Sequence, residues 1–223
     1  MPRQGSYRGG EGTPMAGLRE RQKADRSRRI LAAAVERFRR DGFREARIED
    51  LAEGAEVSVG TVYNYFPTKG DLLMAVVALE VEEVLAAGAA LVDAPPPGAE
   101  AALMALIGGY YEHSLTYLSK EMWRAAMAIS IEAPHTPNGR RYAALDARLS
   151  AQVSEMIRRL QARGEVAPGI DADALGAVVF NNLNGMFMDF VKDETMTLET
   201  LMARVGAQTG ALARLMTTGG RPS

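Results

Sequence analysis

Residues 48–73 read IEDLAEGAEVSVGTVYNYFPTKGDLL, and this stretch decides the fold. Apolar residues at helical spacing predict a first helix, which is broken at Gly54 to Val57. Ser58 is placed to cap a second short helix through its hydroxyl group. Pro67 ends that helix, and the segment from Thr68 to Asp71 has the pattern of a capping box that opens a third helix. The stretch therefore predicts two short helices joined by a tight turn and followed by a longer helix.

The second short helix has two faces of different chemistry. Val62 and Phe66 share one face, and we predict that they belong to the core. The opposite face carries no acidic side chain and is made of Val59, Gly60, Tyr63 and Asn64. A face with small side chains, an amide and a phenol suits close approach to a groove of DNA.

The order and spacing of residues in this stretch resemble those of a known family. The pattern consists of Val57, Ser58, Gly60, Thr61, Val62, Tyr63, Tyr65, Phe66, Lys69 and Leu72. It is similar to the DNA-binding segment of the tetracycline-repressor (TetR) family of bacterial transcription regulators. Because the pattern is long and its spacing is fixed, chance is a poor explanation. The motif lies in the first third of the chain, and the remainder resembles the family in length and in number of helices.

The resemblance implies an all-α fold of about nine helices. An N-terminal three-helix helix-turn-helix DNA-binding domain is followed by a larger helical ligand-binding and dimerisation domain. No β-alternating run of useful length contradicts this class. We expect four parts: a disordered basic N-terminal arm (1–24), the helix-turn-helix domain (25–71), the helical effector-binding and dimerisation domain (72–217) and a flexible tail (218–223). The arm has a second interpretation, as a solvated leader that contacts nothing.

Periodicity and helix-breaking residues set the expected helices. They are predicted over residues 25–41, 48–54, 58–66, 68–91, 99–118, 120–131, 139–163, 171–191 and 197–216. The proline-rich run 93–98 is predicted to be a loop.

Composition and charge limit what the chain can be. The 223 residues include no cysteine, which excludes disulfides, thiol chemistry and cysteine-ligated metal. No apolar run reaches the length of a membrane span and no N-terminal signal region is present, so we expect a cytoplasmic protein without a membrane partner. Residues 1–47 hold 13 Lys and Arg against 6 Asp and Glu, whereas residues 48–223 hold 13 against 22. A basic head on an acidic body suits a protein that binds a polyanion at one end.

The resemblance carries DNA-binding roles onto individual residues. The candidates are Arg28, Arg47, Ser58, Val59, Gly60, Thr61, Tyr63, Asn64, Tyr65 and Lys69. Val59 and Gly60 would lie against base edges, whereas the hydroxyl groups and Lys69 suit phosphate. Asn64 has two open roles, reading an adenine or binding the backbone. Arg47 stands where family members usually carry a small hydroxyl residue, so it is expected to add a base or phosphate contact. For the arginine of the first helix, phosphate binding and a solvent-exposed face both stay open.

A sensor pocket is implied among the middle helices. Its candidate lining residues are mostly aromatic or thioether side chains: Tyr110, His113, Trp123, Met127, Met156, Phe180, Met186 and Phe187. Such side chains form adaptable apolar pockets suited to flat or greasy ligands. At helical spacing the same residues also build ordinary core. His113 is a candidate polar anchor, and a satisfied surface or core histidine is its alternative.

The last two predicted helices are apolar on more than one face. The candidate dimer interface comprises Leu175, Val179, Asn182, Leu183, Leu201, Val205 and Leu212. Small residues at Gly176, Gly185, Gly206 and Gly210 would let helices approach closely. The resemblance implies a four-helix interface with a second copy of the chain. The alternative is a monomer that buries this surface within itself.

Motifs of catalysis are missing from the sequence. There is no glycine-rich phosphate loop and no nucleophile elbow, and His113 and His135 have no partners at metal-ligand spacing. We therefore expect no enzyme, no cofactor and no metal. The main hypothesis is a homodimeric transcription repressor that a small, largely apolar effector releases from a near-palindromic operator. One alternative is a DNA-binding regulator that is controlled by a protein partner or has no effector. Another is a helical enzyme or carrier whose basic N-terminal part has no role in DNA binding.

Overall fold

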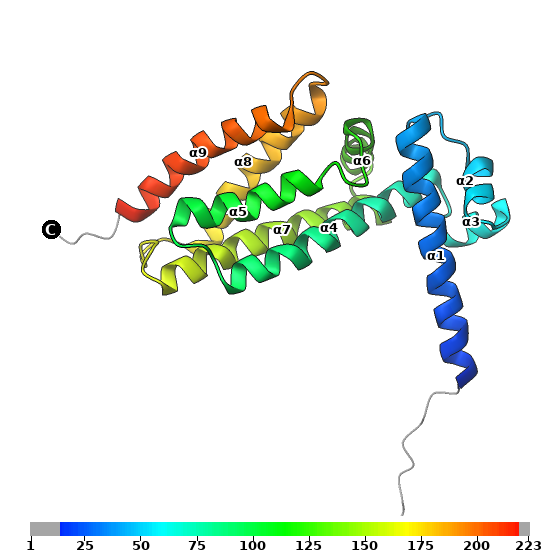
Figure 1. The fold of residues 1–223 in the computed structure, drawn as a ribbon, viewed down its shortest axis with the longest axis horizontal. Coiled ribbons are helices and arrows are strands. Elements are labelled where there is room, and N and C mark those ends of the chain that lie inside the picture. The colour runs from blue at the N-terminus through cyan, green and yellow to red at the C-terminus, as the bar shows by residue number, and fades with distance from the viewer. Residues whose placement is uncertain (1–13, 219–223) are drawn as a thin grey trace, which may run out of the picture.

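The computed structural model describes residues 14–218, and every regular element in that range is an α-helix (Figure 1). The helices are α1 (Pro14–Asp41), α2 (Ile48–Gly54), α3 (Val59–Tyr65), α4 (Lys69–Asp93), α5 (Ala99–His113), α6 (Lys120–Glu132), α7 (Pro137–Ala162), α8 (Ala172–Lys192) and α9 (Leu198–Thr218). Helices α1 to α3 form a head at one end, and α5 to α9 form the body. This confirms the predicted all-α class with a small N-terminal helix-turn-helix unit.

A small apolar core holds the three helices of the head together. Ile30 and Phe38 of α1, Leu51 of α2 and Val62 of α3 are each at most 1% exposed. Phe43 closes this core, with its ring 5.2 Å from the ring of Phe38 in an edge-on arrangement. Burying side chains of this size drives the packing of helices that are too short to be stable alone.

Local capping decides where α3 and α4 begin. The Ser58 hydroxyl accepts a hydrogen bond of 3.1 Å from the backbone N–H of Thr61, as predicted from the sequence. At the start of α4 the Thr68 hydroxyl accepts from the N–H of Asp71 at 3.0 Å, and the Asp71 carboxylate accepts from the N–H of Thr68 at 2.8 Å. The turn before α3 contains Glu56 at φ 54°, a left-handed conformation that favours glycine. The start of each helix is therefore determined by hydrogen bonds between residues three positions apart, Ser58 with Thr61 and Thr68 with Asp71.

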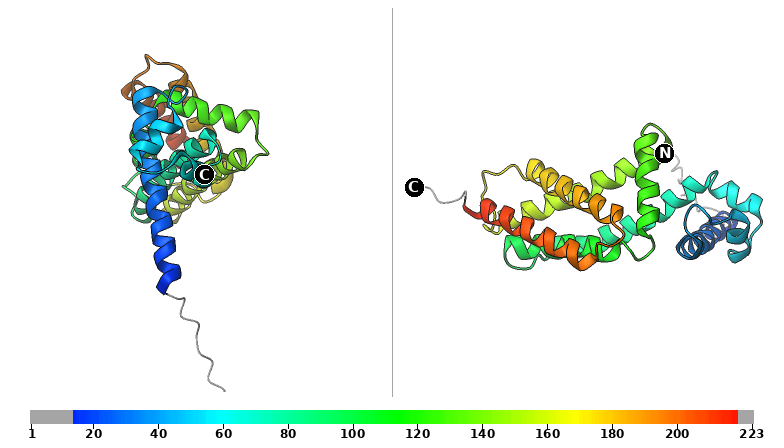
Figure 2. Two further views of the ribbon diagram at one scale, coloured as in Figure 1. Left: turned by 90° about the vertical axis from the view of Figure 1, so that its right-hand side faces the viewer. Right: turned by 90° about the horizontal axis from the view of Figure 1, so that it is seen from above.

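Helix α4 belongs to both parts of the molecule. It leaves the head beside α3 and runs along the body, next to α5 and α7 (Figure 1). Seen along the other axes in Figure 2, the body is elongated, and α8 and α9 lie side by side on one of its faces. The predicted domain boundary near residue 71 thus falls within the first turn of a continuous helix. None of the helices between residues 14 and 218 has the length and apolar character needed to cross a membrane.

Two predicted helix boundaries differ from the structure by more than two residues. Helix α1 begins at Pro14 rather than at Asp25, while residues 1–13 of the predicted arm lie outside the described residues. The segment 17–24 is exposed yet rich in helix-favouring residues, and it extends a helix that the head already nucleates. Helix α5 ends at His113 instead of continuing to Leu118, because groups from α4 and α6 bind the backbone of the following turn.

Part of the predicted dimer interface is used inside the chain. Val179, Leu183, Leu201 and Val205 are at most 4% exposed in a single chain, so they pack the core between α8, α9 and the rest of the body. Apolar periodicity alone could not separate burial by a neighbouring helix from burial by a second copy. Three predicted residues keep partly exposed side chains: Leu175, Asn182 and Leu212.

The close approach of α7 and α8 depends on one glycine. A Cβ built at Gly176 would meet the Ser154 hydroxyl and would lie 2.8 Å from the Ser154 Cα atom. Backbone atoms cannot yield as a flexible side chain does, so the two helices would have to separate. Of the small residues noted in the sequence, Gly176 therefore serves contacts within the chain.

We predict that Gly176→Ala lowers the free energy of unfolding by about 1–3 kcal/mol, because overpacking forces α7 and α8 apart. Urea denaturation followed by circular dichroism measures this. The matched control is Gly109→Ala, since a Cβ at Gly109 in α5 meets no atom within 4 Å. Equal stability of the two variants would contradict the prediction.

Candidate functional site

The outer face of α3 is the first candidate site. Gly60, Tyr63 and Asn64 are exposed, and the Tyr63 side chain keeps 46% of its surface accessible. Val59 is partly buried against the head core, and Val62 is 1% exposed, as expected for the inward face. A Cβ at Gly60 would have only the Ser58 hydroxyl, at 3.9 Å, as a neighbour. The surface above Gly60 is therefore open on the side away from the protein.

Several predicted DNA-binding groups already have partners within the head. The hydroxyl groups of Ser58 and Thr61 lie 2.8 Å apart, and the Tyr65 ring lies 6.4 Å from that of Phe66. The Lys69 ammonium donates a 2.8 Å hydrogen bond to the carbonyl of Arg44, and partial burial lowers the pKa of Lys69. This lysine thus holds the loop before α2, and its phosphate contact stays a prediction.

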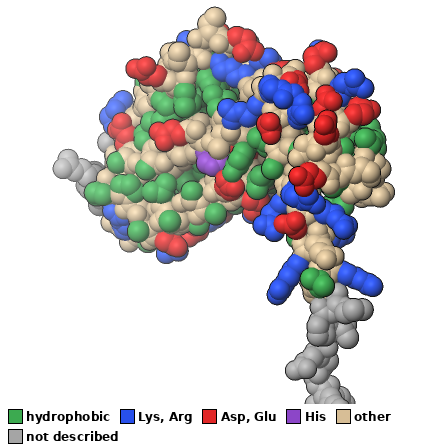
Figure 3. All heavy atoms as spheres, turned by 45° about the vertical axis from the view of Figure 1, so that its right-hand side comes forward, with side chains coloured by type: hydrophobic (Ala, Val, Ile, Leu, Met, Phe, Trp, Pro, Cys, Tyr) green, Lys and Arg blue, Asp and Glu red, His purple; other side chains and the backbone are tan. Residues whose placement is uncertain are grey.

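Two predicted arginines are exposed near the head. The Arg47 side chain is 71% exposed, makes no capping bond to α2 and lies 3.6 Å from Glu49. The Arg28 side chain is 77% exposed and pairs with Asp25 at 3.3 Å. Exposed pairs of this kind are weak, so both guanidinium groups are available for other anions. Figure 3 shows basic side chains gathered on the projecting part of α1, where the arginines and lysine between residues 19 and 29 are all exposed.

The second candidate site is a cavity of ≈ 80 Å³ in the body, which we call the aromatic cavity. Helices α4, α5, α6, α7 and α8 all contribute to its wall. Six aromatic side chains line it: Tyr110, Tyr111, Trp123, Tyr142, Phe180 and Phe187. Two carboxylates, Glu80 and Asp146, and the amide of Asn184 also face it. The cavity is thus apolar in area but contains acidic groups.

Half of the predicted pocket residues line this cavity. Tyr110, Trp123, Phe180 and Phe187 do so, with Trp123 packed edge-on to Phe187 at 5.2 Å. The other four predicted residues lie elsewhere: Met127 lines an adjoining cavity, Met156 is fully buried core, Met186 packs beside Asn182, and His113 stands behind Glu80.

Sequence reasoning missed the polar residues of the cavity. Glu80 interrupts the apolar run of α4, and Asp146 lies on the face of α7 that carries Tyr142, Leu145 and Leu149. A charged residue within an apolar helical face was the available signal, since such residues are rarely buried without a reason.

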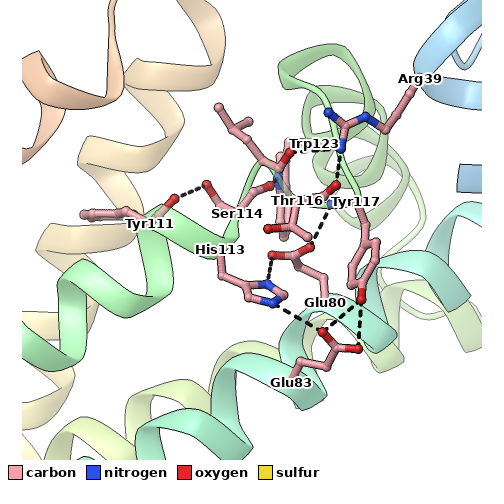
Figure 4. A network of polar contacts seen from close by, with 10 residues as sticks. Arg39, Glu80, Glu83, Tyr111, His113, Ser114, Thr116, Tyr117 and Trp123 are labelled. Carbon is pink, nitrogen blue, oxygen red and sulfur yellow. Dashed lines mark hydrogen bonds and ion pairs between the residues drawn. The ribbon is translucent and has the colours of Figure 1, made fainter. Parts of the chain in front are cut away.

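Glu80 belongs to a network that closes one side of the cavity (Figure 4). Its side chain is 1% exposed, and one oxygen lies 2.6 Å from Nδ1 of His113 while the other accepts from the Tyr117 N–H at 3.3 Å. The second His113 nitrogen lies 3.3 Å from Glu83, whose carboxylate accepts from the Tyr117 hydroxyl at 3.0 Å. Burial raises the pKa of Glu80, and the hydrogen bond from His113 opposes this effect. His113 is therefore a satisfied histidine that supports the wall.

The same network reaches the head. The Arg39 guanidinium of α1 donates to the carbonyl groups of Leu115, at 3.2 Å, and of Thr116 in the turn between α5 and α6. In that turn the Ser114 carbonyl accepts a 2.7 Å hydrogen bond from the Trp123 indole N–H. The turn therefore touches the cavity wall on one side and the head on the other, as Figure 4 shows.

Asp146 is unlike the other carboxylates of the body. It is partly buried, and it makes neither a hydrogen bond nor an ion pair with any residue that the structure describes. Burial alone raises the pKa of Asp146 to about 6, with no neighbouring cation to offset it. An unpaired carboxylate in an apolar site costs stability and is characteristic of binding sites. Within residues 14–218 no three His, Cys, Asp or Glu side chains are grouped to hold a metal ion.

We predict that Asp146→Asn raises the free energy of unfolding above pH 6, by at most about 3 kcal/mol. The folded-state pKa of about 6 lies above the ordinary value of 3.8, so the native chain loses stability as the pH rises between these values. Asparagine cannot ionise and removes that loss. Urea denaturation at pH 4 and pH 7.5 tests this, because the two proteins should differ only at the higher pH.

Comparisons with known proteins agree with the geometry of the head and with the overall fold. The family model described as bacterial regulatory proteins, tetR family, matches residues 30–76. The transcriptional repressor KstR of Rhodococcus jostii is 36% identical over 67 residues, a match that covers 30% of this chain and 32% of KstR. The transcriptional regulator BetI of Escherichia coli O45:K1 is 30% identical over 169 residues, covering 74% of this chain and 86% of BetI.

Solved structures extend the similarity of fold to the body. A TetR-family regulator from Pectobacterium atrosepticum superposes with a TM-score of 0.71 at 20% identity, covering 91% of this chain and 99% of that one. A transcriptional regulator from Saccharomonospora viridis in complex with choline has a TM-score of 0.61 at 22% identity, covering 83% and 95%. The helix-turn-helix head, the helical body and the relationship to BetI along most of its length lead to one conclusion: the chain belongs to the TetR family of bacterial transcriptional regulators.

Proposed function

We propose that this chain is a homodimeric repressor that leaves a near-palindromic operator when a small effector binds in the aromatic cavity. The observation that carries this proposal is the course of α4. Its capping box lies directly after α3, and its later turns line the cavity with Val77, Glu80, Val81 and Val84. One rigid helix thus joins the candidate DNA reader to the candidate sensor. An effector that changes the position of α4 in the body would move the head.

DNA reading is assigned to the open face of α3. Val59, Gly60 and Asn64 would meet base edges, and Tyr63 with the exposed arginines would meet phosphates. The exposure of Gly60, Tyr63 and Asn64, and the lack of any acidic side chain among these α3 residues, supports this role. Two copies of α3 would enter successive major grooves, whose centres are about 34–36 Å apart.

Dimerisation is assigned to the outer faces of α8 and α9. Val178 is 54% exposed and Leu215 is 70% exposed, which is unusual for large apolar side chains in this molecule. Gly185, one more turn along the Leu175–Asn182 side of α8, would have no atom within 4 Å of an added Cβ. An apolar surface that includes an uncovered small residue fits a second copy packed helix against helix.

Coupling between the sites would use two connections. Besides α4, the turn between α5 and α6 holds Arg39 of the head and forms part of the cavity wall through Ser114. An effector that binds one arrangement of this turn more tightly than the other would shift the population of head positions. By linkage, DNA would then reduce the affinity for the effector by the same factor as the effector reduces the affinity for DNA. The presence of a lined cavity disfavours the alternative of a regulator without a small-molecule effector. The choline complex of the Saccharomonospora viridis regulator shows that a protein of this fold can hold a small ligand.

We predict that Gly60→Leu reduces operator affinity by about tenfold or more while leaving the thermal unfolding temperature unchanged or higher. An added Cβ at Gly60 meets only the Ser58 hydroxyl, at 3.9 Å, so we expect the protein to tolerate a larger side chain that a groove of DNA would exclude. Fluorescence anisotropy with an operator selected from genomic fragments measures the affinity. Gly60→Ala serves as the matched control, with a smaller loss expected. If both variants bound the operator with unchanged affinity, the assignment of α3 as the DNA-contacting helix would be wrong.

A second prediction concerns assembly. Val178→Asp should weaken dimerisation by about a hundredfold, because two unpaired carboxylates would be buried near the two-fold axis. Sedimentation equilibrium measures the dissociation constant. Leu18→Asp is the control, since Leu18 is 58% exposed on α1, away from α8 and α9. If both variants stay dimeric, the interface lies on another surface.

A further inference from the structure

We propose that the aromatic cavity binds a small organic cation with an alkylated ammonium group. This inference deepens the proposed function, since it names the chemical class of the effector and rests on the cavity as the effector site. It also revises the expectation of a largely apolar effector, because the lining contains two carboxylates, Glu80 and Asp146, that were not predicted from the sequence to face a pocket. Three properties of the wall carry it.

The first property is that the aromatic residues present ring surface rather than polar groups. The Tyr110 hydroxyl donates a 2.7 Å hydrogen bond to the Gln152 side chain, and the Tyr111 hydroxyl donates to the Leu183 carbonyl at 2.8 Å. The Trp123 indole N–H is occupied by the Ser114 carbonyl. These three polar groups already have protein partners, so Tyr110, Tyr111 and Trp123 offer a ligand mainly their ring surface, whereas the Tyr142 hydroxyl has no hydrogen bond among the described residues. Ring faces carry negative electrostatic potential and attract cations.

The second property is the sign of the charge. Glu80 and Asp146 face the cavity, and none of its described lining residues is Lys, Arg or His. Glu80 has His113 as a partner at 2.6 Å, and the other nitrogen of that ring lies 3.3 Å from Glu83. Asp146 has no such partner among the described residues. An anionic ligand would be repelled, and a neutral one would leave the carboxylate unpaired in a poorly hydrated site.

The third property is the scarcity of hydrogen-bond acceptors around the cavity. Both oxygens of Glu80 are engaged, one by His113 and the other by the Tyr117 N–H. Of the polar lining side chains, Tyr142, Asp146 and Asn184 are left without a hydrogen bond in the described structure, and Asp146 is the one charged acceptor among these three. A primary ammonium needs three acceptors, and a bare metal ion needs several oxygen ligands. An alkylated ammonium needs few or none, because its charge is spread over carbon-bound hydrogens that fit ring faces. It therefore matches this wall better than the other cations do.

The volumes of the aromatic cavity and of the cavity next to it limit the size and shape of a ligand that can bind. The aromatic cavity of ≈ 80 Å³ is small, but Tyr142, Asp146 and Asn184 also line an adjoining cavity of ≈ 250 Å³, which we call the outer cavity. The outer cavity reaches Ile131 of α6, a residue that is 69% exposed. We place the ammonium head between Asp146 and the aromatic rings, with any longer substituent directed into the outer cavity.

The test compares two ligands of the same shape and different charge. Choline and its neutral carbon isostere 3,3-dimethylbutan-1-ol are titrated into the DNA-free, full-length protein by isothermal calorimetry. We expect choline to bind at least about tenfold more tightly, a difference of about 1.4 kcal/mol. Equal affinities, or no detectable heat with choline at millimolar concentration, would overturn the proposal.

Variants locate the charge and the ring surface that matter. Asp146→Asn should reduce choline affinity by about tenfold and leave the affinity of the alcohol unchanged. Asp189→Asn is the matched control, because Asp189 of α8 is 73% exposed and, among the described residues, forms an ion pair only with Lys192, at 3.9 Å. Phe180→Leu removes one aromatic face without a change of charge and should also weaken choline selectively. Thermal unfolding of each variant verifies that it is folded, and loss of choline affinity in Asp189→Asn alone would contradict the assignment.

The outcomes separate this inference from the proposed function. If choline binds with the expected dependence on Asp146 but does not release operator DNA, the cation site stands and release by an effector in this cavity fails. If the neutral alcohol releases operator as well as choline does, the regulator stands and the cation site is wrong.

Discussion

The structure depends on one helix that has to satisfy two cores at once. The capping box of Thr68 and Asp71 fixes the first turn of α4 beside α3, so that this turn has little freedom to move relative to the head. From Leu72 to Val81 every residue of the helix except Leu79 is buried, first against the head and then within the body. A helix with a continuous hydrogen-bond ladder transmits a displacement along its length. In the proposed mechanism, a change at the cavity end would therefore be felt at the head end.

The aromatic cavity contains a partly buried carboxylate, Asp146, that lowers the stability of the body. Elsewhere the buried polar groups are satisfied, as with the Tyr111 hydroxyl on the Leu183 carbonyl or the Ser114 hydroxyl on the Tyr111 carbonyl. At Asp146 the chain keeps a partly buried carboxylate whose pKa is raised because it lacks a compensating partner in the described structure. A core optimised only for stability would place an apolar side chain there. Three of the aromatic residues around it, Tyr110, Tyr111 and Trp123, are held in place by their own hydrogen bonds.

The local elements of the fold could be read from the sequence, and the reasons are visible in particular residues. The starts of α3 and α4 are decided by Ser58 and Thr68, each bonded to a backbone N–H three residues ahead. The end of α5 could not be read in this way. It stops at His113 because Glu80 of α4 binds the Tyr117 N–H and Trp123 of α6 binds the Ser114 carbonyl, contacts that join distant parts of the chain. The extension of α1 back to Pro14 was missed because a solvated helix needs no apolar pattern.

The sequence by itself determined the all-α class, the helix-turn-helix head and four of the six aromatic residues of the cavity wall. The class and the head follow from periodicity, capping and motif spacing, which act over a few residues, whereas the aromatic residues were selected through the family resemblance. Only the tertiary structure decided the acidic half of the wall and the division of the apolar faces of α8 and α9. Glu80 and Asp146 lie 66 positions apart and become neighbours of one cavity only when α4 packs on α7. Likewise, Val179 and Val205 are covered by their own chain while Val178 is left exposed, because burial depends on which helix packs against each face.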